Sequence, residues 1–351
     1  MGHRVDSIVL ISSFHFTVLA LFCCNQLANG CDLFTGRWVY DPSYPLYNAS
    51  ACPFMEREFS CQQNGRRDLL YTRYRWQPSR CSVTRFDALN FLKSFRGKSI
   101  MFVGDSLSLN QWQSLACMLH SALPNATFNI TTVADVSTFE FQGYGVKVML
   151  DRNLFLVDVV KENIGRVLKL DSIEGGQLWK GIDLLIFNTW HWWNRRGPTQ
   201  PWDFIEVGGV IKKDMDRMLA FETALRTWAA WVNANINPSK SRVFFQGISP
   251  SHYNASSWNE AKARSCLGQT QPLLSSSYPD GVPPALGVLK KVLNTVRKDV
   301  TLLDITMLSL LRKDGHPSIY GTGAANGMDC SHWCLAGVPD TWNEILYSLI
   351  V

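Results

Sequence analysis

The sequence lacks a long uninterrupted apolar run. Its most apolar stretch, residues 7–24, is broken by four polar residues between Ser12 and Thr17, so it would make a poor membrane-spanning helix. Arg4 precedes the stretch and the small residues 28–30 follow it, as in a cleaved secretory leader. We therefore expect a signal peptide in residues 1–30, with a retained signal anchor as the alternative. Either segment would place the rest of the chain in the secretory lumen.

Neither positive nor negative charge is in excess over most of the chain. The net charge is +5, and residues 31–100 account for it with 11 Lys or Arg against 6 Asp or Glu. A lumenal location excludes nucleic acid as the partner, so the surplus favours an acidic polysaccharide. The candidate contacts are arginines interleaved with aromatic residues: Arg66, Arg67, Arg73 and Arg75. The alternative is that these arginines are solvated or form internal ion pairs, with Asp68 or with backbone carbonyls.

Motifs that hold a metal ion or a nucleotide are missing. Cys330 and Cys334 have a spacing that zinc could use, but no second close pair of ligands accompanies them. We find no phosphate-cradling glycine-rich loop and no internal repeat. We therefore expect no metal and no tightly bound cofactor.

Cysteine, by contrast, is plentiful. Eight cysteines follow residue 30: Cys31, Cys52, Cys61, Cys81, Cys117, Cys266, Cys330 and Cys334. An even number in an oxidising compartment predicts four disulfides, although spacing alone does not fix their pairing. Four N-glycosylation sequons agree with a lumenal location: Asn48, Asn125, Asn129 and Asn254.

The order of apolar segments predicts an α/β fold. The 46% hydrophobic content, with 13 Trp and 19 Phe, excludes a disordered chain. Residues 31–98 carry four cysteines but no long periodic segment, so we expect a disulfide-stapled, loop-rich subdomain. Over residues 99–351 strands alternate with helices, which predicts a mainly parallel sheet covered on both faces.

The predicted elements of this domain are short and apolar. The expected strands are Ser99–Val103, Gly145–Leu150, Leu154–Val159, Ile182–Asn188, Arg242–Gln246 and Thr301–Ile305. The expected helices are Leu107–Leu119, Asp214–Ala234 and Leu286–Arg297, and Gly268–Pro284 is expected to form a surface loop.

A strand-to-helix turn at Gly104-Asp105-Ser106 offers a nucleophile. Glycine permits a tight turn, and a serine at the start of a helix lies where backbone amides and the helix dipole favour a developing oxyanion. The alternative role of the serine is a helix N-cap. Asp105 is adjacent to the serine, which suits it to bracing the turn.

A second short motif, Asp329-x-x-His332, supplies a base and an orienting acid. Cys330 and Cys334 flank the histidine and would hold it rigidly. With Ser106, the motif completes the set that acyl transfer through serine requires. His252 and His316 are alternative bases.

Further candidates follow the strand that ends at Asn188. Ligand groups gather at the carboxyl ends of strands in open α/β sheets, so the amide of Asn188 is a candidate oxyanion donor. His191, Trp192 and Trp193 come next along the chain. The tryptophans would either stack on a sugar ring or pack in the core.

Ordered blocks through nearly all of residues 31–351 match one family. They are Cys31–Val39, Cys52–Phe54, Gly65–Asp68, Arg75–Pro78 before Cys81, Gly104–Leu107 with Asn110–Trp112, Phe187–Trp193, Leu303–Thr306, and Asp329–Cys334 with Gly337–Asn343. In these blocks the chain resembles the plant trichome birefringence-like proteins of the GDSL/SGNH-type esterase superfamily.

The resemblance implies O-acetylation of plant cell-wall polysaccharides in the Golgi lumen. Ser106 would carry the acetyl group, with His332 as base and Asp329 as its orienting acid. The resemblance also points to Cys266 as the partner of one of the two cysteines that flank His332, and to Cys61 as the partner of the other. Two features depart from many members: Leu109 stands where they have arginine, and Cys31 follows the leader at once. The second departure leaves export to the wall open.

We therefore predict a serine-dependent O-acetyltransferase that acts on a wall polysaccharide. We favour pectin over xylan as the substrate because the N-terminal region is basic. An acetyl donor is required, and the sequence does not reveal its identity. A secreted acetylesterase is the close alternative, since water in place of a sugar hydroxyl would give hydrolysis. A non-catalytic, pectin-binding wall protein is the second alternative.

Overall fold

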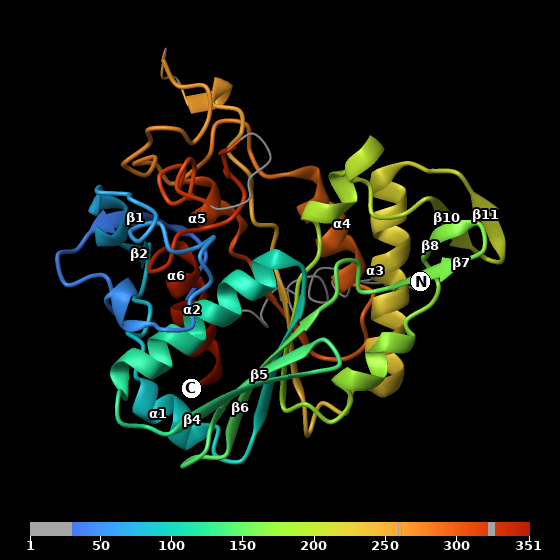
Figure 1. Cartoon of the computed structure of the whole chain (residues 1–351), viewed down its shortest axis with the longest axis horizontal. Coiled ribbons are helices and arrows are strands. Elements are labelled where there is room, and N and C mark those ends of the chain that lie inside the picture. Colours follow the sequence, from blue (N-terminus) through green and yellow to red (C-terminus); the bar gives the residue numbers. More distant parts are fainter. Residues whose placement is uncertain (1–29, 259, 261, 322–326) are drawn as a thin grey trace, which may run out of the picture.

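A seven-stranded sheet lies at the centre of the computed structural model, which describes residues 30–258, 260, 262–321 and 327–351 (Figure 1). In spatial order its strands are β13 (Val300–Leu303), β12 (Arg242–Gln246), β9 (Leu184–Phe187), β3 (Ser99–Gly104), β6 (Val146–Arg152), β5 (Val136–Phe141) and β4 (Phe128–Val133). The strands from β13 to β6 are parallel to one another, and β5 and β4 add an antiparallel edge. The predicted mainly parallel α/β fold is confirmed.

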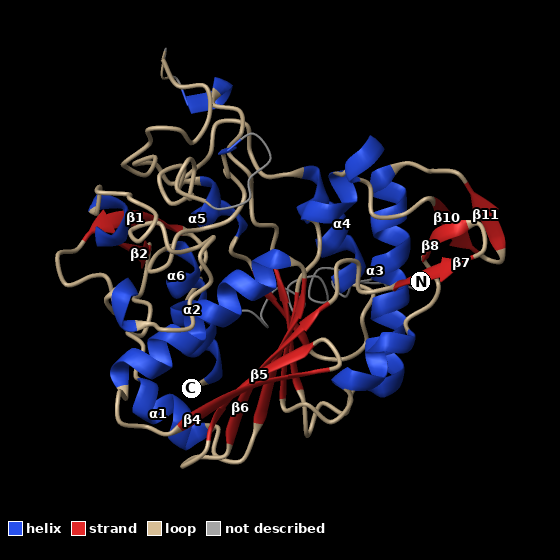
Figure 2. Cartoon of the chain, viewed as in Figure 1, coloured by secondary structure: helices blue, strands red, loops and turns tan. Residues whose placement is uncertain are grey.

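Helices cover both faces of this sheet (Figure 2). They are α1 (Ala88–Ser94), α2 (Ser106–Ala122), α3 (Arg217–Asn235), α4 (Pro284–Leu293), α5 (Thr306–Leu310) and α6 (Val338–Ile350). Alternate residues of β3 point to opposite faces: Ile100 and Phe102 join the core under α1, α2 and α6, whereas Met101 and Val103 join the core under α3 and α4. Every residue of β9 is buried, as expected of a strand between two helical layers.

The N-terminal region is tied covalently to the rest of the molecule. It contains an antiparallel pair, β1 (Gly36–Tyr40) and β2 (Tyr74–Pro78), and the internal disulfide Cys31–Cys81. Its other two cysteines reach outward in the bonds Cys52–Cys117 and Cys61–Cys334. The predicted disulfide-stapled subdomain is therefore present, and it packs into the same core as α2 and α6.

Two predicted elements differ in the structure. Residues 154–157 form a buried loop instead of a strand, because Phe155, Leu156 and Val157 fill the core without pairing. The following strand, β7 (Asp158–Glu162), belongs to a second, four-stranded sheet with β8 (Gly165–Lys169), β10 (Phe204–Val207) and β11 (Val210–Lys212). The helix predicted to reach residue 297 ends at Leu293, where Asn294 caps it.

The predicted leader lies outside the described residues, apart from Gly30. Within the part of the chain that the structure describes, no helix is long and apolar enough to cross a membrane. The predicted loop at Gly268–Pro284 is confirmed as an irregular and mostly exposed segment up to the start of α4.

Candidate active site

The turn at Gly104 brings Ser106 to the edge of the sheet. β3 ends at Gly104, and α2 begins at Ser106 with Asp105 as its N-cap. A Cβ atom on residue 104 would lie 2.3 Å from the carbonyl oxygen of Asn188 and 2.5 Å from the hydroxyl of Ser108. Only glycine therefore permits this close approach of β3 to the end of β9.

Asp105 braces this turn, as its position in the sequence predicts. Its Oδ1 atom accepts a hydrogen bond from the backbone N–H of Leu107 at 2.9 Å. The same oxygen accepts one from the side-chain amide of Asn188 at 2.6 Å. Asn188 thus positions the turn with one amide hydrogen, and a second hydrogen remains for the predicted oxyanion contact.

Ser106, His332 and Asp329 form a continuous hydrogen-bonded chain. The hydroxyl of Ser106 lies 2.6 Å from Nε2 of His332, and Nδ1 of His332 lies 2.7 Å from Oδ2 of Asp329. Because a carboxylate only accepts, Nδ1 carries the proton, which leaves Nε2 free to accept from the serine. The His332 side chain is 19% exposed, so the site is sheltered but open to solvent.

Asp329 and His332 stabilise each other's charged forms. Burial alone would lower the pKa of His332, but the hydrogen bond and charge of Asp329 outweigh it and raise the pKa above its ordinary value. Burial would likewise raise the pKa of Asp329, whereas His332 and the backbone N–H of Ser331 hold it well below its usual range. Asp329 therefore remains ionised and favours an imidazolium at His332.

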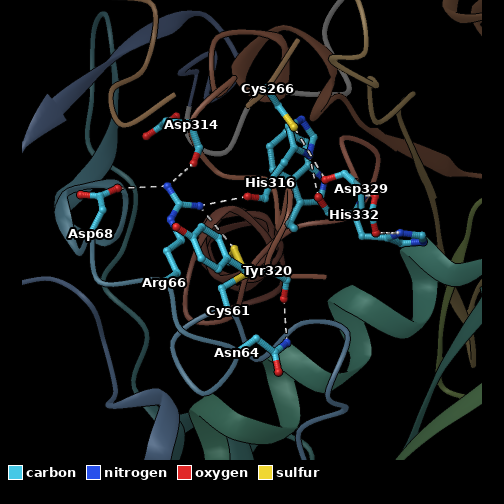
Figure 3. The surroundings of a disulfide bond; sticks show 12 residues. Cys61, Asn64, Arg66, Asp68, Cys266, Asp314, His316, Tyr320, Asp329 and His332 are labelled. Atoms are coloured by element: carbon cyan, nitrogen blue, oxygen red, sulfur yellow. Dashed lines mark hydrogen bonds and ion pairs between the residues drawn. A yellow bond between two sulfur atoms is a disulfide. The ribbon is translucent and has the colours of Figure 1, made fainter. Parts of the chain in front are cut away.

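Disulfides anchor His332 on both sides. Cys330 is bonded to Cys266, and Cys334 is bonded to Cys61 of the N-terminal region (Figure 3). The partners that the family resemblance implied are confirmed. Because both sulfurs are used in this way, neither is available as a thiolate ligand, and the zinc alternative at this pair is wrong.

Phe59 is a site neighbour that the sequence did not reveal. Its ring lies 5.8 Å, between centroids, from the imidazole of His332, and the residue is fully buried. It belongs to the N-terminal region, two residues before Cys61. The link Cys61–Cys334 explains its placement, but no pattern in the sequence marks Phe59 itself.

The two alternative bases do not face the serine. His252 and His316 are each 1% exposed, and their rings contact each other at 2.6 Å between Nδ1 of His252 and Nε2 of His316. His316 also reaches the backbone carbonyl of His332. Neither is shown in contact with Ser106, so the structure favours His332 as its partner.

The arginine cluster of the N-terminal region is largely internal. Arg66 is buried: it pairs with Asp68 and donates to the carbonyl oxygens of His316 and Asp314 (Figure 3). Arg73 donates to two backbone carbonyls, those of residues 42 and 44, and Arg75 pairs with Asp41. For Arg66 the predicted polymer contact is wrong, because its charge is used inside the protein. Arg67 is exposed.

A cleft of about 720 Å³ opens next to His332. Its lining includes Ser331, His191, Trp190, Arg195, Arg196 and Tyr253. His191 donates from Nε2 to the carbonyl oxygen of Ser249 at 2.8 Å, and burial lowers its pKa, so it presents a neutral Nδ1 acceptor.

The tryptophans predicted beside this cleft have different roles. Trp193 is fully buried and donates to the hydroxyl of Thr189, so it packs in the core. Trp192 is half-buried, and the guanidinium of Arg195 lies 4.1 Å from its ring centroid. Arg217 in turn donates to the backbone carbonyl of Arg195 at 3.5 Å. These contacts hold Arg195 at the cleft edge.

The remaining sequence-based candidates are placed as follows. The four sequon asparagines, Asn48, Asn125, Asn129 and Asn254, are all exposed, and Asn254 also lines the cleft. Leu109, which stands where many family members have arginine, is buried on α2.

Comparisons with known proteins identify the family. Residues 83–349 match PC-Esterase, described as the GDSL/SGNH-like acyl-esterase family found in Pmr5 and Cas1p, and residues 29–82 match the PMR5 N-terminal domain. Protein trichome birefringence-like 41 of Arabidopsis thaliana is 61% identical over 347 residues, which cover 99% of this chain and 97% of that protein. Protein trichome birefringence-like 38 of the same plant is 54% identical over 324 residues, with 92% and 84% covered. The chain therefore belongs to the trichome birefringence-like proteins, within the PC-esterase family.

Proposed function

We propose that this protein transfers acetyl groups to a plant cell-wall polysaccharide through an acetyl-serine intermediate on Ser106. The observation that carries the proposal is the hydrogen-bonded chain from Ser106 through His332 to Asp329. Four disulfides agree with action in the secretory pathway or the wall, where an oxidising environment preserves them.

In the first step the donor acetyl group moves to the serine. Nε2 of His332 takes the hydroxyl proton as Ser106 attacks the acetyl carbonyl, and Asp329 stabilises the resulting imidazolium. The N-terminus of α2 and the side-chain amide of Asn188 lie at this turn, and their N–H groups are the candidate donors to the developing oxyanion. The imidazolium then protonates the leaving group of the donor.

In the second step a sugar hydroxyl takes the place of the leaving group. His332 removes the hydroxyl proton, the oxygen attacks the acetyl-serine, and Ser106 recovers its proton as the new ester leaves. The cleft beside Ser331 would hold the polymer, and the neutral Nδ1 of His191 would accept a hydrogen bond from a neighbouring sugar hydroxyl.

Pectin remains the favoured polymer, but the support for it moves from the N-terminal region to the cleft. Arg195 and Arg196 are exposed there, and Arg195 is held over Trp192. Guanidinium groups bind carboxylates in paired geometry, and a polyuronate carries a carboxylate on each acidic sugar. Among the described residues that line the cleft, Asp280 is acidic whereas Arg195 and Arg196 are cationic, so positive charge is in excess there.

An acetylesterase is the second candidate function. The same acetyl-serine is hydrolysed when water attacks it, and the cleft is open to solvent at one side of His332. Both candidates share the first step, so they differ in whether the acetyl group ends on a sugar or in solution.

The test follows acetyl groups by mass. Purified protein would be incubated with oligogalacturonides or xylan oligomers and a chemical acetyl donor such as 4-nitrophenyl acetate. Gain of acetyl groups on the oligomers supports transfer. Loss from pre-acetylated oligomers, without gain on bare ones, supports the esterase. Neither change, with polymer binding intact, would favour a non-catalytic wall protein.

A further inference from the structure

Two buried histidines that take no part in the proposed reaction, His252 and His316, form a row of contacts that ends at the backbone of His332. Nε2 of His252 lies 3.0 Å from the carbonyl oxygen of Leu310. Nδ1 of His252 lies 2.6 Å from Nε2 of His316, and Nδ1 of His316 lies 2.6 Å from the carbonyl oxygen of His332. All four ring nitrogens are therefore engaged, in three contacts.

These three contacts need three protons. A carbonyl oxygen only accepts, so Nε2 of His252 and Nδ1 of His316 must each carry a hydrogen. A neutral imidazole has one such hydrogen, and both are then used at the outer ends. The two inner nitrogens would meet at 2.6 Å with only lone pairs between them, although that separation is typical of a hydrogen bond.

We infer that His252 and His316 together carry three ring N–H protons, one more than two neutral imidazoles have. This buried cation positions His332 and disfavours its protonation. The inference rests on the proposed role of His332 as the base. His316 would fix the backbone of His332 through its carbonyl, and the positive charge of the pair would disfavour a second positive charge on the imidazole of His332.

The surroundings of the pair contain both opposing and favourable groups. Burial disfavours a cation on either ring and lowers the pKa of each, and Lys313 acts on His252 in the same direction. The cation Arg66 donates to the carbonyl oxygen of His316. These groups oppose protonation, so the shared proton depends on the contacts made by the rings themselves.

Several contacts offset that opposition. The two carbonyl acceptors take the place of water at both ends of the pair. The ring of Trp333 stacks on His316 with centroids 4.0 Å apart, which offers a π face to the cation. The negative charge of Asp329 also favours protonation of His316. Two nearby cations are each paired with a carboxylate: Lys313 with Glu260, and the buried Arg312 with Asp314.

The first experiment counts the protons without using activity. The full-length protein, labelled with ¹⁵N in its histidine rings, would be examined by NMR at neutral pH. Three exchange-protected imidazole N–H protons assigned to His252 and His316 are expected. Two such protons, one on each ring, would overturn the inference whatever the enzyme does.

The second experiment removes the charge while keeping the bond to His332. In the His252→Asn variant an amide nitrogen would lie near the present Nδ1 and donate to Nε2 of His316, so His316 can stay neutral and still hold the His332 carbonyl. We expect the acid limb of the kcat/KM–pH profile to move up by about one unit, because the nearby positive charge is gone. A profile that keeps its acid limb would contradict the tuning role.

A matched control separates charge from packing. Ser309→Ala removes a buried neutral hydrogen bond to Trp342 and changes no charge. We expect it to lower stability without moving the acid limb. If Ser106→Ala retained activity, the proposed function would fail while the proton count of the pair would still stand.

Discussion

At the scale of single residues, the proposed acetyl transfer depends on one hydroxyl, that of Ser106. Ser106→Ala keeps the N-terminus of α2, since Asp105 supplies the cap, but removes the atom that would accept the acetyl group. We expect acetyl transfer to fall by at least about 10³-fold with an unchanged fold. Initial rates with 4-nitrophenyl acetate and labelling by a serine-directed phosphonate measure this. Ser121→Ala, near the other end of α2, is the control, and equal loss in both variants would sink the serine mechanism.

Asp329 sets which nitrogen of His332 carries the proton. In Asp329→Asn the amide oxygen can still accept from the backbone N–H groups of Ser331 and His332, as Oδ1 does now. The amide nitrogen then faces Nδ1 of His332 and forces the proton onto Nε2, so the ring can no longer accept from Ser106. We expect kcat to fall by about 10³- to 10⁴-fold. The remaining activity should have an acid limb at lower pH, because the charge that raises the pKa of His332 is lost.

The comparison for this variant is the pH–rate profile of the parent protein. A near-normal kcat, or an acid limb that stays in place, would show that Asp329 does not orient the base. Circular dichroism of both proteins establishes that the fold is intact.

Residue-level patterns predicted which residues lie together at the candidate site better than they predicted which charged side chains are exposed. Gly104, Ser106 and His332 were readable because a strand, a turn and a rigid flanking motif restrict where their side chains lie. Arg66 and Arg67 are neighbours in the sequence, yet the first is buried and the second exposed. Arg66 points inward because it donates to the carbonyl oxygens of residues 314 and 316, which are far away in the sequence.

At the scale of elements, α6 carries two buried acids, Asp340 in its first turn and Glu344 in its middle. Asp340 accepts from Ser114 and from the backbone N–H of Gly337, and Glu344 accepts from Tyr44. Burial raises the pKa of each carboxyl to about 7 despite these bonds. Both residues therefore hold a proton in the folded protein that the unfolded chain releases near pH 4.

The two buried acids of α6 should make the protein more stable against unfolding at mildly acidic pH than at alkaline pH. Between about pH 4 and pH 7 the folded state binds more protons than the unfolded state, so this contribution to the free energy of unfolding declines as pH rises and is lost above about pH 7. Asp340→Asn, which does not titrate, should flatten the pH dependence. Urea unfolding of parent and variant at pH 5, 6, 7 and 8 provides the measurement. Parallel curves for the two proteins would contradict the prediction.

Strong apolar runs predicted elements, and weak ones did not. β3, β9 and β12 are buried strands of the parallel sheet, and each was visible as an apolar segment. β4 is largely exposed, so its residues show no clear period. The loop 154–157 is as apolar as a strand because it fills the core, and hydrophobicity alone does not distinguish the two.

At the scale of the whole molecule, the cleft charge should govern the choice of polymer. If Arg195 and Arg196 contact uronates, affinity for polygalacturonate should be high at low salt and fall steeply, because the Debye length shrinks from about 10 Å at 0.1 M to about 3 Å at 1 M. Replacing both arginines by glutamine should remove most of this salt dependence. Affinity for neutral xylan oligomers should change little in either case.

The control for this prediction is Arg67→Gln, which alters an exposed arginine outside the cleft lining. Calorimetry or fluorescence anisotropy over a salt series gives the affinities. Equal, salt-insensitive binding of both polymers would remove pectin from first place. A large effect of Arg67→Gln alone would return the contact to the N-terminal region.

The bond Cys61–Cys334 joins two segments separated by 273 positions. Replacing both cysteines by alanine should lower the free energy of unfolding by about 2–4 kcal/mol. The specific activity of the molecules that remain folded should also fall, because one of the two disulfides that anchor His332 is lost. The double replacement of Cys31 and Cys81, whose bond lies far from His332 in sequence, is the matched control. Equal specific activity of the two folded variants would show that the anchor is dispensable.

The contact between Ser106 and His332 also has a consequence in time. The two residues are 226 positions apart, and ribosomes add about 5–20 residues per second, so roughly 10 to 45 seconds separate their synthesis. Cys61 must wait even longer for its disulfide partner, because Cys334 follows it by 273 positions. Ser106 is therefore made long before its hydrogen-bond partner, and the proposed set of Ser106, His332 and Asp329 forms only when synthesis of the chain is almost complete.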